Sequence, residues 1–166
     1  MENKRNTRNL VIFIILFVTV LVAIDQITKA LIVNNIYNLE IKIIDNLLKF
    51  TYIENTGGAF GIGQNNTMTF IITNIVVLGI VMRFVIIQKD KLDTKVLISL
   101  LMIFAGGVSN LVDRVCRGFV VDFIDITDIF KFPIFNIADV FLVVGWMLLA
   151  LFITVYTLKS KKRGIL

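Results

Sequence analysis

The chain has 166 residues, of which 57% are hydrophobic and 17% are charged, and its formal net charge is +5. Its mean hydropathy of +0.88 excludes an ordinary soluble domain, and its length leaves room for roughly four spanning helices of about 20 residues each. Histidine is absent and Cys116 is the one cysteine, which excludes an intrachain disulfide, a Cys or His zinc site, and Ser-His or Cys-His nucleophilic catalysis. Any hydrolytic chemistry has to rest on carboxylates, lysine, serine or a metal bound through oxygen.

Four apolar runs predict four membrane-spanning helices, at about residues 10–32, 68–88, 96–113 and 137–158. The first run is preceded by Lys4, Arg5 and Arg8, as in a signal peptide, but no small-x-small cleavage site follows it. We therefore interpret it as an uncleaved span. The polar loop 89–95 is short, so the second and third helices should be antiparallel neighbours.

The positive charges predict how the chain is oriented in the membrane. Eleven of the 17 Lys and Arg residues lie ahead of the first span, in 83–95, or in 159–163. The positive-inside rule then places both termini in the cytoplasm and segments 34–66 and 114–136 outside. We interpret the net charge as membrane topology rather than nucleic-acid binding, and we expect one integral membrane domain over residues 1–166.

The outer segments carry their own structural signals. Apolar and polar residues alternate over 48–53, and 118–126 is rich in Phe, Val and Ile with interspersed acids, so we expect a small sheet on the outer membrane surface. Three glycines in 55–61 indicate a tight turn or a close backbone approach to a ligand. The predicted fold class is thus membrane all-α, with four transmembrane helices, a small extracytoplasmic β-sheet and a short loop or helix beside it.

Several polar residues lie at the outward ends of the predicted spans, although an ionisable group costs at least about 2.5–3.5 kcal/mol at the bilayer centre. Asp25 and Lys29 are four residues apart and share a helical face, so we interpret them as a structural ion pair. Asn110, Asp113 and Arg114 form one polar stripe at the end of the third span. Residues of these types at this depth need a partner or a function.

Two neighbouring features each have two interpretations. Gly106 and Gly107 allow close helix packing, but they could equally make room for a substrate. Asp122, Asp125 and Asp128 recur at every third residue, which could form a solvated edge or a cation site. Apolar residues between these acids leave no clean polar face, so we disfavour both the solvated helical edge and the cation site.

The fourth span begins with a clear start signal. Pro133 precedes it, Asn136 is a plausible N-cap, and Asp139 then occupies the third helical position. An acid there could simply complement the helix dipole, which is worth about 0.3–1 kcal/mol. Asp122, an acid flanked by apolar residues on the same side of the membrane, favours a functional pair instead.

These residues fall in five short blocks, which occupy positions 25–29, 55–60, 107–114, 120–123 and 135–139. In this order and on these spans the blocks resemble the signature of lipoprotein signal peptidase, also called signal peptidase II, an aspartic membrane protease of bacteria. The resemblance extends over the whole chain, and five blocks in order are far more specific than any one of them.

The resemblance implies that Asp122 and Asp139 are the catalytic pair. Asp113 is a rival for the second acid, but it lies beside Arg114 on the polar stripe, where a structural ion pair satisfies it. The residues implied to bind substrate are Asn55, Gly57, Asn110, Arg114 and Asn136. Those implied to support the site are Asp25, Lys29 and Asp113.

The implied reaction removes the signal peptide from a prolipoprotein whose cysteine already carries a diacylglyceryl group, by cleavage on the N-terminal side of that cysteine. Two close carboxylates that share a proton can activate water, so no metal and no organic cofactor is expected. The resemblance further implies contact with membrane lipids, inhibition by globomycin-type cyclic peptides, and a site on the outer side of the bacterial cytoplasmic membrane. We expect a monomer and no nucleic-acid partner.

Two other classes of function compete with the peptidase. A small proton- or cation-coupled transporter predicts acids near the membrane midplane and often inverted repeats, and neither is visible in the sequence. A structural or assembly subunit predicts polar residues that are explained wholly by helix pairing. It leaves Asp122, outside every predicted span, without an explanation.

Overall fold

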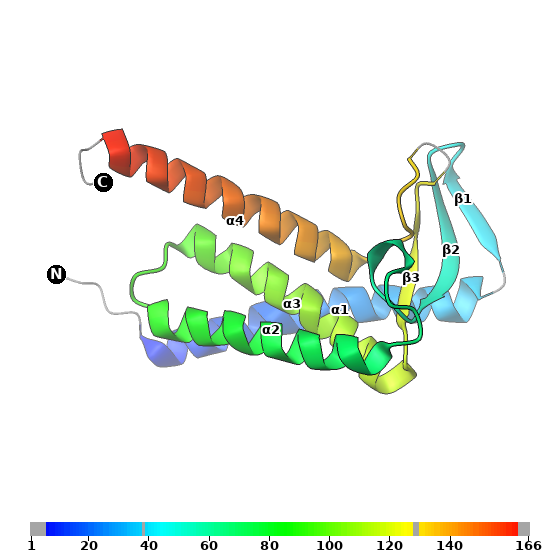
Figure 1. Ribbon diagram of the computed structural model, residues 1–166, viewed down its shortest axis with the longest axis horizontal. Coiled ribbons are helices and arrows are strands. Elements are labelled where there is room, and N and C mark those ends of the chain that lie inside the picture. Colours follow the sequence, from blue (N-terminus) through cyan, green and yellow to red (C-terminus); the bar gives the residue numbers. More distant parts are fainter. Residues whose placement is uncertain (1–5, 38, 128–129, 163–166) are drawn as a thin grey trace.

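The structure, a computed structural model, describes residues 6–37, 39–127 and 130–162 (Figure 1). Over these ranges it contains four long helices, which are α1 (Thr7–Ile36), α2 (Thr67–Gln88), α3 (Thr94–Arg117) and α4 (Ile137–Lys162). Each is long and apolar enough to cross a membrane, and in Figure 1 they lie together with the sheet at one end. The chain is a multi-pass membrane protein with the four expected helices.

The helices are longer than the apolar runs that predicted them. α1 begins at Thr7 because the side chain of Asn6 caps it, accepting a hydrogen bond from the backbone N–H of Arg8 at 3.0 Å. α3 continues past its apolar run to Arg117, and Gly118 ends it in the left-handed conformation (φ 84°). Residues that the sequence assigned to an outer loop are therefore the last turn of α3.

α3 is the central helix, because it contacts the other three and 61% of its most apolar stretch is buried. Close contact depends on small residues. A Cβ on Gly106 would lie 2.5 Å from the carbonyl oxygen of Ala138, and one on Gly107 would lie 2.9 Å from Leu78 Cδ2. The structure thus supports helix packing, rather than room for a substrate, as the role of both glycines.

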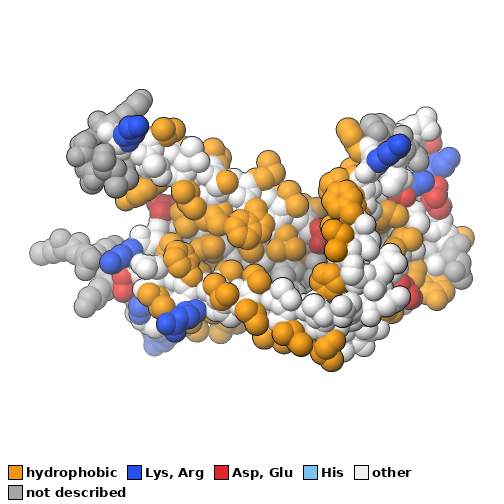
Figure 2. Space-filling view, in the orientation of Figure 1, with side chains coloured by type: hydrophobic (Ala, Val, Ile, Leu, Met, Phe, Trp, Pro, Cys, Tyr) orange, Lys and Arg blue, Asp and Glu red, His pale blue; other side chains and the backbone are white. Residues whose placement is uncertain are grey.

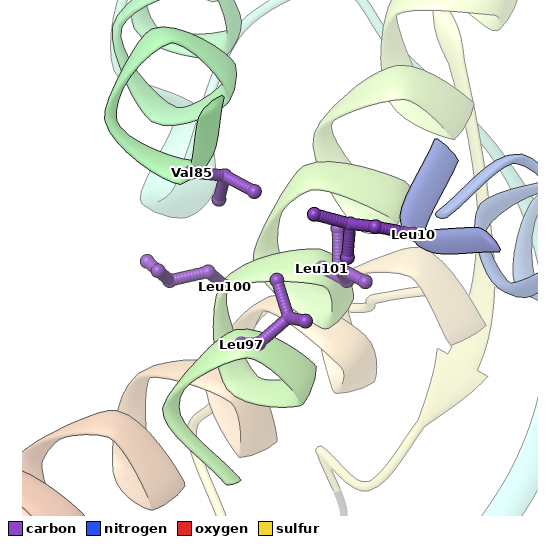
Figure 3. Close-up of a cluster of buried hydrophobic side chains, with 5 residues drawn as sticks. All are labelled: Leu10, Val85, Leu97, Leu100 and Leu101. Atoms are coloured by element: carbon purple, nitrogen blue, oxygen red, sulfur yellow. The ribbon is translucent and has the colours of Figure 1, made fainter. Parts of the chain in front are cut away.

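A cluster of buried aliphatic side chains holds α1, α2 and α3 together at the end away from the sheet (Figure 3). Its members are Leu10, Val85, Leu97, Leu100 and Leu101. On the outside the helices expose many large apolar side chains, and Figure 2 shows hydrophobic side chains over the middle of one face. An apolar exterior of this extent fits lipid rather than water.

The sheet has three antiparallel strands in the order β1-β2-β3, which are β1 (Glu40–Ile44), β2 (Leu48–Asn55) and β3 (Val120–Asp125). Two of them match the predicted strands, whereas β1 was missed even though apolar and polar residues alternate along it. Ile32 and Ile36 of α1 pack against Val121 and Phe123 of β3, which fixes the sheet to the end of α1.

A short 3₁₀ helix, η1 (Ala59–Gly61), follows β2 and confirms the tight turn predicted there. Phe60 and Gly61 adopt positive φ values of 60° and 73°. Figure 1 shows the sheet at the end of the molecule where α3 ends and α4 begins, with η1 beside β3.

Candidate active site

Asp139 is fixed by the start of α4. The side-chain oxygen of Asn136 accepts a hydrogen bond from the Asp139 backbone N–H at 2.9 Å, and the Asn136 backbone N–H donates to Asp139 Oδ2 at 3.1 Å. This reciprocal pair is a capping box, which confirms Asn136 as the N-cap. The other oxygen of Asp139, Oδ1, accepts from Asn110 Nδ2 at 2.9 Å. Asp139 thus helps to start α4 and is also reached by a side chain from α3.

Asp122 is held on β3 by two amide side chains. Its Oδ1 accepts from Asn136 Nδ2 at 2.6 Å, and its Oδ2 accepts from Asn55 Nδ2 at 2.8 Å. Asn55 is oriented in turn, because its own oxygen accepts from the Gly57 backbone N–H at 2.9 Å. Asn136 therefore bonds to both aspartates, and it brings a residue of β3 and a residue of α4 to one place.

The charge state of Asp122 is shifted by its surroundings. Burial, followed by the negative charge of Asp139, raises the pKa of Asp122 from its ordinary value of 3.8 to about 7, although hydrogen bonds from Asn55 and Asn136 act to lower it. Among the residues that the structure describes, neither Asp122 nor Asp139 forms an ion pair. The pair is therefore able to retain one proton near neutral pH.

A buried ion-pair network lies directly behind this pair. Lys29 Nζ is 2.7 Å from both Asp25 Oδ2 and Asp113 Oδ2, and all three side chains are 0% exposed. The same ammonium donates to Asn110 Oδ1 at 2.9 Å. The predicted Asp25–Lys29 ion pair is confirmed, and Lys29 also fixes the amide orientation of Asn110 so that Nδ2 faces Asp139.

Asp113 is ion-paired, as expected, but with partners other than its sequence neighbour Arg114. Its carboxylate contacts Lys29 on one oxygen and Arg117, one helical turn further along α3, on the other. Arg114 points elsewhere, because adjacent helical positions face different directions. Asp113 is thus neutralised, which separates it from the pair formed by Asp122 and Asp139.

Sequence reasoning missed three residues of this network. Gln26 donates to Asp113 Oδ1 at 3.0 Å, Ser109 Oγ donates to Asp25 Oδ2 at 2.6 Å, and Arg117 completes the contact described above. The i, i+4 spacing from Asp113 to Arg117 could have indicated the last of these. Asp25 Oδ1 also accepts from the Ala138 backbone N–H at 2.8 Å, which ties α1 to the start of α4.

A cavity of about 440 Å³ opens in front of the aspartates. Five predicted site residues line it, namely Asn55, Asn110, Arg114, Asp122 and Asp139. Its other walls are largely apolar and include Phe132, Pro133, Ile134, Val140 and Val143. Asn136 is fully buried and Gly57 is outside the lining, so these two predicted residues do not face the cavity. They contact residues that do.

Arg114 joins α3 to the loop that follows β2. Its Nη2 donates to the carbonyl oxygen of Gly57 at 2.8 Å, and its guanidinium lies 5.2 Å from the ring centroid of Phe70. Gly57 has to be glycine in this geometry, because a Cβ there would lie 2.7 Å from the carbonyl oxygen of Ile62. The glycine-rich turn thus packs closely against Arg114 and residue 62, and a close approach of its backbone to a ligand stays a prediction.

Asp125 does not belong to the pair. It accepts from the Thr127 backbone N–H at 2.8 Å and lies 3.6 Å from Lys49 Nζ. Asp128, the last member of the acidic series in the sequence, lies outside the described residues. Within the described ranges, no group of three or more His, Cys, Asp or Glu side chains could hold a metal ion.

Comparison with known proteins gives a consistent result. A family profile described as signal peptidase (SPase) II matches residues 17–155. A lipoprotein signal peptidase from Clostridioides difficile is 38% identical over 89% of this chain and 98% of its own length, and one from Caldanaerobacter subterraneus is 41% identical over 81% and 91%. A solved structure of a bacterial membrane enzyme has a TM-score of 0.76 and 33% identity, covering 91% of this chain and 90% of that one. The chain belongs to the signal peptidase II family.

Proposed function

We propose that the chain is an aspartic endopeptidase that removes the signal peptide from diacylglyceryl-modified prolipoproteins, cutting on the N-terminal side of the lipidated cysteine. The substrate class is supported by the relatives, which are named lipoprotein signal peptidases. The aspartic mechanism is supported by one observation above all. Asp122 and Asp139 line one cavity, are both bonded to Asn136, and have no cationic partner among the described residues.

The proposed chemistry uses one proton shared by the two carboxyl groups. The ionised carboxylate takes a proton from water, and the resulting hydroxide adds to the scissile carbonyl carbon while the protonated carboxyl gives its proton to the carbonyl oxygen. The tetrahedral intermediate then loses its C–N bond. The first carboxyl gives its proton to the leaving nitrogen, and one hydroxyl of the gem-diol gives its proton to the second carboxylate as the C=O bond re-forms, so the pair again holds one proton.

The remaining groups of the cavity suit an extended peptide that carries a lipid. Arg114 lines the cavity, so its guanidinium can donate to a substrate carbonyl. The apolar walls formed by Phe132, Ile134 and Val143 exclude water and offer contact to acyl chains. Asn55 and Asn110 each have an amide at the cavity surface and orient the aspartates at the same time.

The location of the site follows from the orientation of the helices. Asp139 is in the first turn of α4, and Arg8, the basic segment 83–95 and Lys159 lie at the other end of the helices, so we propose that the site is on the extracytoplasmic side of the bacterial cytoplasmic membrane. At this depth a lipid-modified substrate can stay in the bilayer while its peptide bond reaches water. We also propose a monomer and inhibition by globomycin-type cyclic peptides, which would occupy the same cavity.

The decisive experiment compares two precursors. The purified chain is incubated with one prolipoprotein in its diacylglyceryl-modified and unmodified forms, and the product N-terminus is determined by mass spectrometry. We expect cleavage of the modified precursor alone, directly before the lipidated cysteine. Equal cleavage of both forms would overturn the substrate class, and normal cleavage by an Asp122→Asn variant would overturn the mechanism.

A further inference from the structure

A second cavity lies at the opposite end of the helices from the aspartates, between the start of α3 and the end of α4. The two helices are in close contact at Gly145, where a Cβ would lie 3.0 Å from the Ser99 carbonyl oxygen. Beyond this point they line a cavity of about 380 Å³, and Figure 1 shows the end of α4 extending past the start of α3. Asp139 and Tyr156 are roughly 25 Å apart along α4 at about 1.5 Å per residue, so the cavity lies at the other membrane boundary.

The walls of this cavity are apolar and its rim is basic. The walls include Leu92, Val96, Phe152, Ile153 and Val155, and the rim carries Lys91, Lys95 and Lys159. All three lysines are exposed. The one acid in the lining, Asp93, caps α3 by accepting from the Lys95 backbone N–H at 2.8 Å. The Lys95 ammonium lies 5.7 Å from the ring centroid of Phe152, which joins the basic rim to the apolar wall.

We infer that this groove binds one anionic phospholipid of the cytoplasmic leaflet. Its phosphate would lie among Lys91, Lys95 and Lys159, and an acyl chain would lie along the apolar walls. A phospholipid is complementary to this groove, because it has a phosphate and an apolar chain side by side, as the basic rim and the apolar walls require. Lysine-rich surfaces on the cytoplasmic side attract anionic lipids, and basic pockets between helices hold their headgroups.

The inferred lipid has a structural consequence. Lys91 precedes α3, Lys95 is in its first turn, and Lys159 is near the end of α4. A single phosphate can therefore connect the two helices at the end where they line this cavity. A bound lipid should therefore stabilise the pairing of α3 with α4. The inference is independent of the proposed protease function, because none of these residues lines the cavity at Asp122 and Asp139.

Native mass spectrometry of the full chain in a neutral detergent tests the inference, with titrated phosphatidylglycerol as the probe. The test variant is Lys91→Gln/Lys95→Gln/Lys159→Gln. The matched control is Arg83→Gln/Lys89→Gln/Lys161→Gln, which removes the same charge from cytoplasmic-end residues outside the cavity lining. At about fivefold per lysine, we expect roughly 100-fold weaker binding by the test variant and a much smaller change in the control. Val155→Trp, which fills the apolar wall and keeps every lysine, should also weaken binding.

Three outcomes would overturn the inference. Equal losses in the test and control variants would mean that the lipid responds to overall surface charge. Equal binding of phosphatidylcholine would mean that the rim plays no part. If inorganic phosphate raised the melting temperature as much as phosphatidylglycerol does, the site would bind a free anion rather than a lipid. Circular dichroism of each variant, together with phosphatidylglycerol binding by the control, excludes loss of the fold as the explanation.

Discussion

Two groups of aspartates lie close together at the sheet end of the helices, and a different kind of partner holds each group. Asp25 and Asp113 contact the buried ammonium of Lys29, and their charge is neutralised. Asp122 and Asp139 accept hydrogen bonds from uncharged amide groups of Asn55, Asn110 and Asn136. An ammonium partner fixes a carboxylate in its charged form, whereas an amide orients a carboxyl group without fixing its charge. The first arrangement suits a scaffold, and the second suits proton transfer.

The two groups are also connected. Asn110 accepts a hydrogen bond from Lys29 and donates one to Asp139. Lys29 therefore determines that the NH₂ end of this amide faces Asp139. Asp25 reaches the backbone of Ala138, next to Asp139. A substitution in the scaffold, Asp25, Lys29 and Asp113, should therefore lower stability, and activity should fall as a result. A substitution of Asp122 or Asp139 should lower activity while the fold is retained.

The largest expected effect is the loss of activity in Asp139→Asn. General acid–base catalysis by a positioned group contributes about 10²- to 10⁴-fold, so cleavage should fall by at least about 100-fold. The melting temperature should change little, because an asparagine retains an acceptor for the capping box. Asp125→Asn is the matched control, since this acid bonds to Thr127 and lies outside the pair. Equal losses in both variants would remove the distinction between the pair and a buried acid that is held by Lys49 and Thr127.

Replacement of Lys29 by Met should give the largest loss of stability. It leaves two fully buried carboxylates without their shared cation, and breaking a buried ion pair costs about 3–5 kcal/mol. The measurement is thermal unfolding in detergent, with Lys42→Met on the exposed strand β1 as the control. If Lys29→Met unfolded like the wild type while losing activity, Lys29 would belong to the reactive pair rather than to the scaffold.

A charge-removing substitution should have opposite effects in the two groups. Asp113→Asn weakens the contacts of Lys29 and Arg117 and should lower the free energy of unfolding by about 1–3 kcal/mol. At pH 8, Asp122→Asn should raise the free energy of unfolding by about 1 kcal/mol. The variant no longer buries a negative charge, and this gain exceeds the loss from its weaker hydrogen bonds. Thermal unfolding of both variants at pH 8 and pH 5 checks the signs.

The sign for Asp122 follows from its pKa, which the fold raises from 3.8 to about 7. Between these values the folded state binds more protons than the unfolded state, so this group makes the wild type more stable as the pH falls from 7 toward 4. The benefit of Asp122→Asn should therefore shrink at pH 5. A benefit that grew as the pH fell would show that Asp122 is stabilised as a carboxylate, in the manner of Asp113.

The capping arrangement that holds Asp139 could be predicted from the sequence because its signals are local, whereas the pairing of Asp122 with Asp139 was implied by the resemblance to signal peptidase II. The capping role of Asn136 and the position of Asp139 in the first turn follow from a few consecutive residues. The scaffold could be predicted only in part. Asp25 and Lys29 are one turn apart on α1, but the contact from Lys29 to Asp113 joins residues on different helices, and no spacing rule indicates it.

Strand β1 and the neighbours of Asp113 show why the rest was missed. All five residues of β1 are exposed, so the alternation in its sequence corresponds to no buried face, and the strand is defined by its pairing with β2. Gln26 and Ser109 are polar residues inside apolar helices, and which carboxylate each one bonds depends on how α1 packs against α3. Local patterns predict elements, whereas hydrogen-bond partners are set by packing.

The smallest expected effect tests whether the amides tune the pair as well as orient it. Asn55 donates to Asp122 and acts to lower its pKa, so Asn55→Ala should raise that pKa above about 7. The pair then keeps its shared proton to higher pH, and the alkaline limb of the pH profile of kcat/KM should move upward by a fraction of a unit. Tyr52→Phe, which removes a hydroxyl bonded to Glu54 on the same strand, is the control and should leave the limb in place. A downward shift in Asn55→Ala would mean that the limb reports a group other than Asp122, and the assignment of the shared proton would have to be given up.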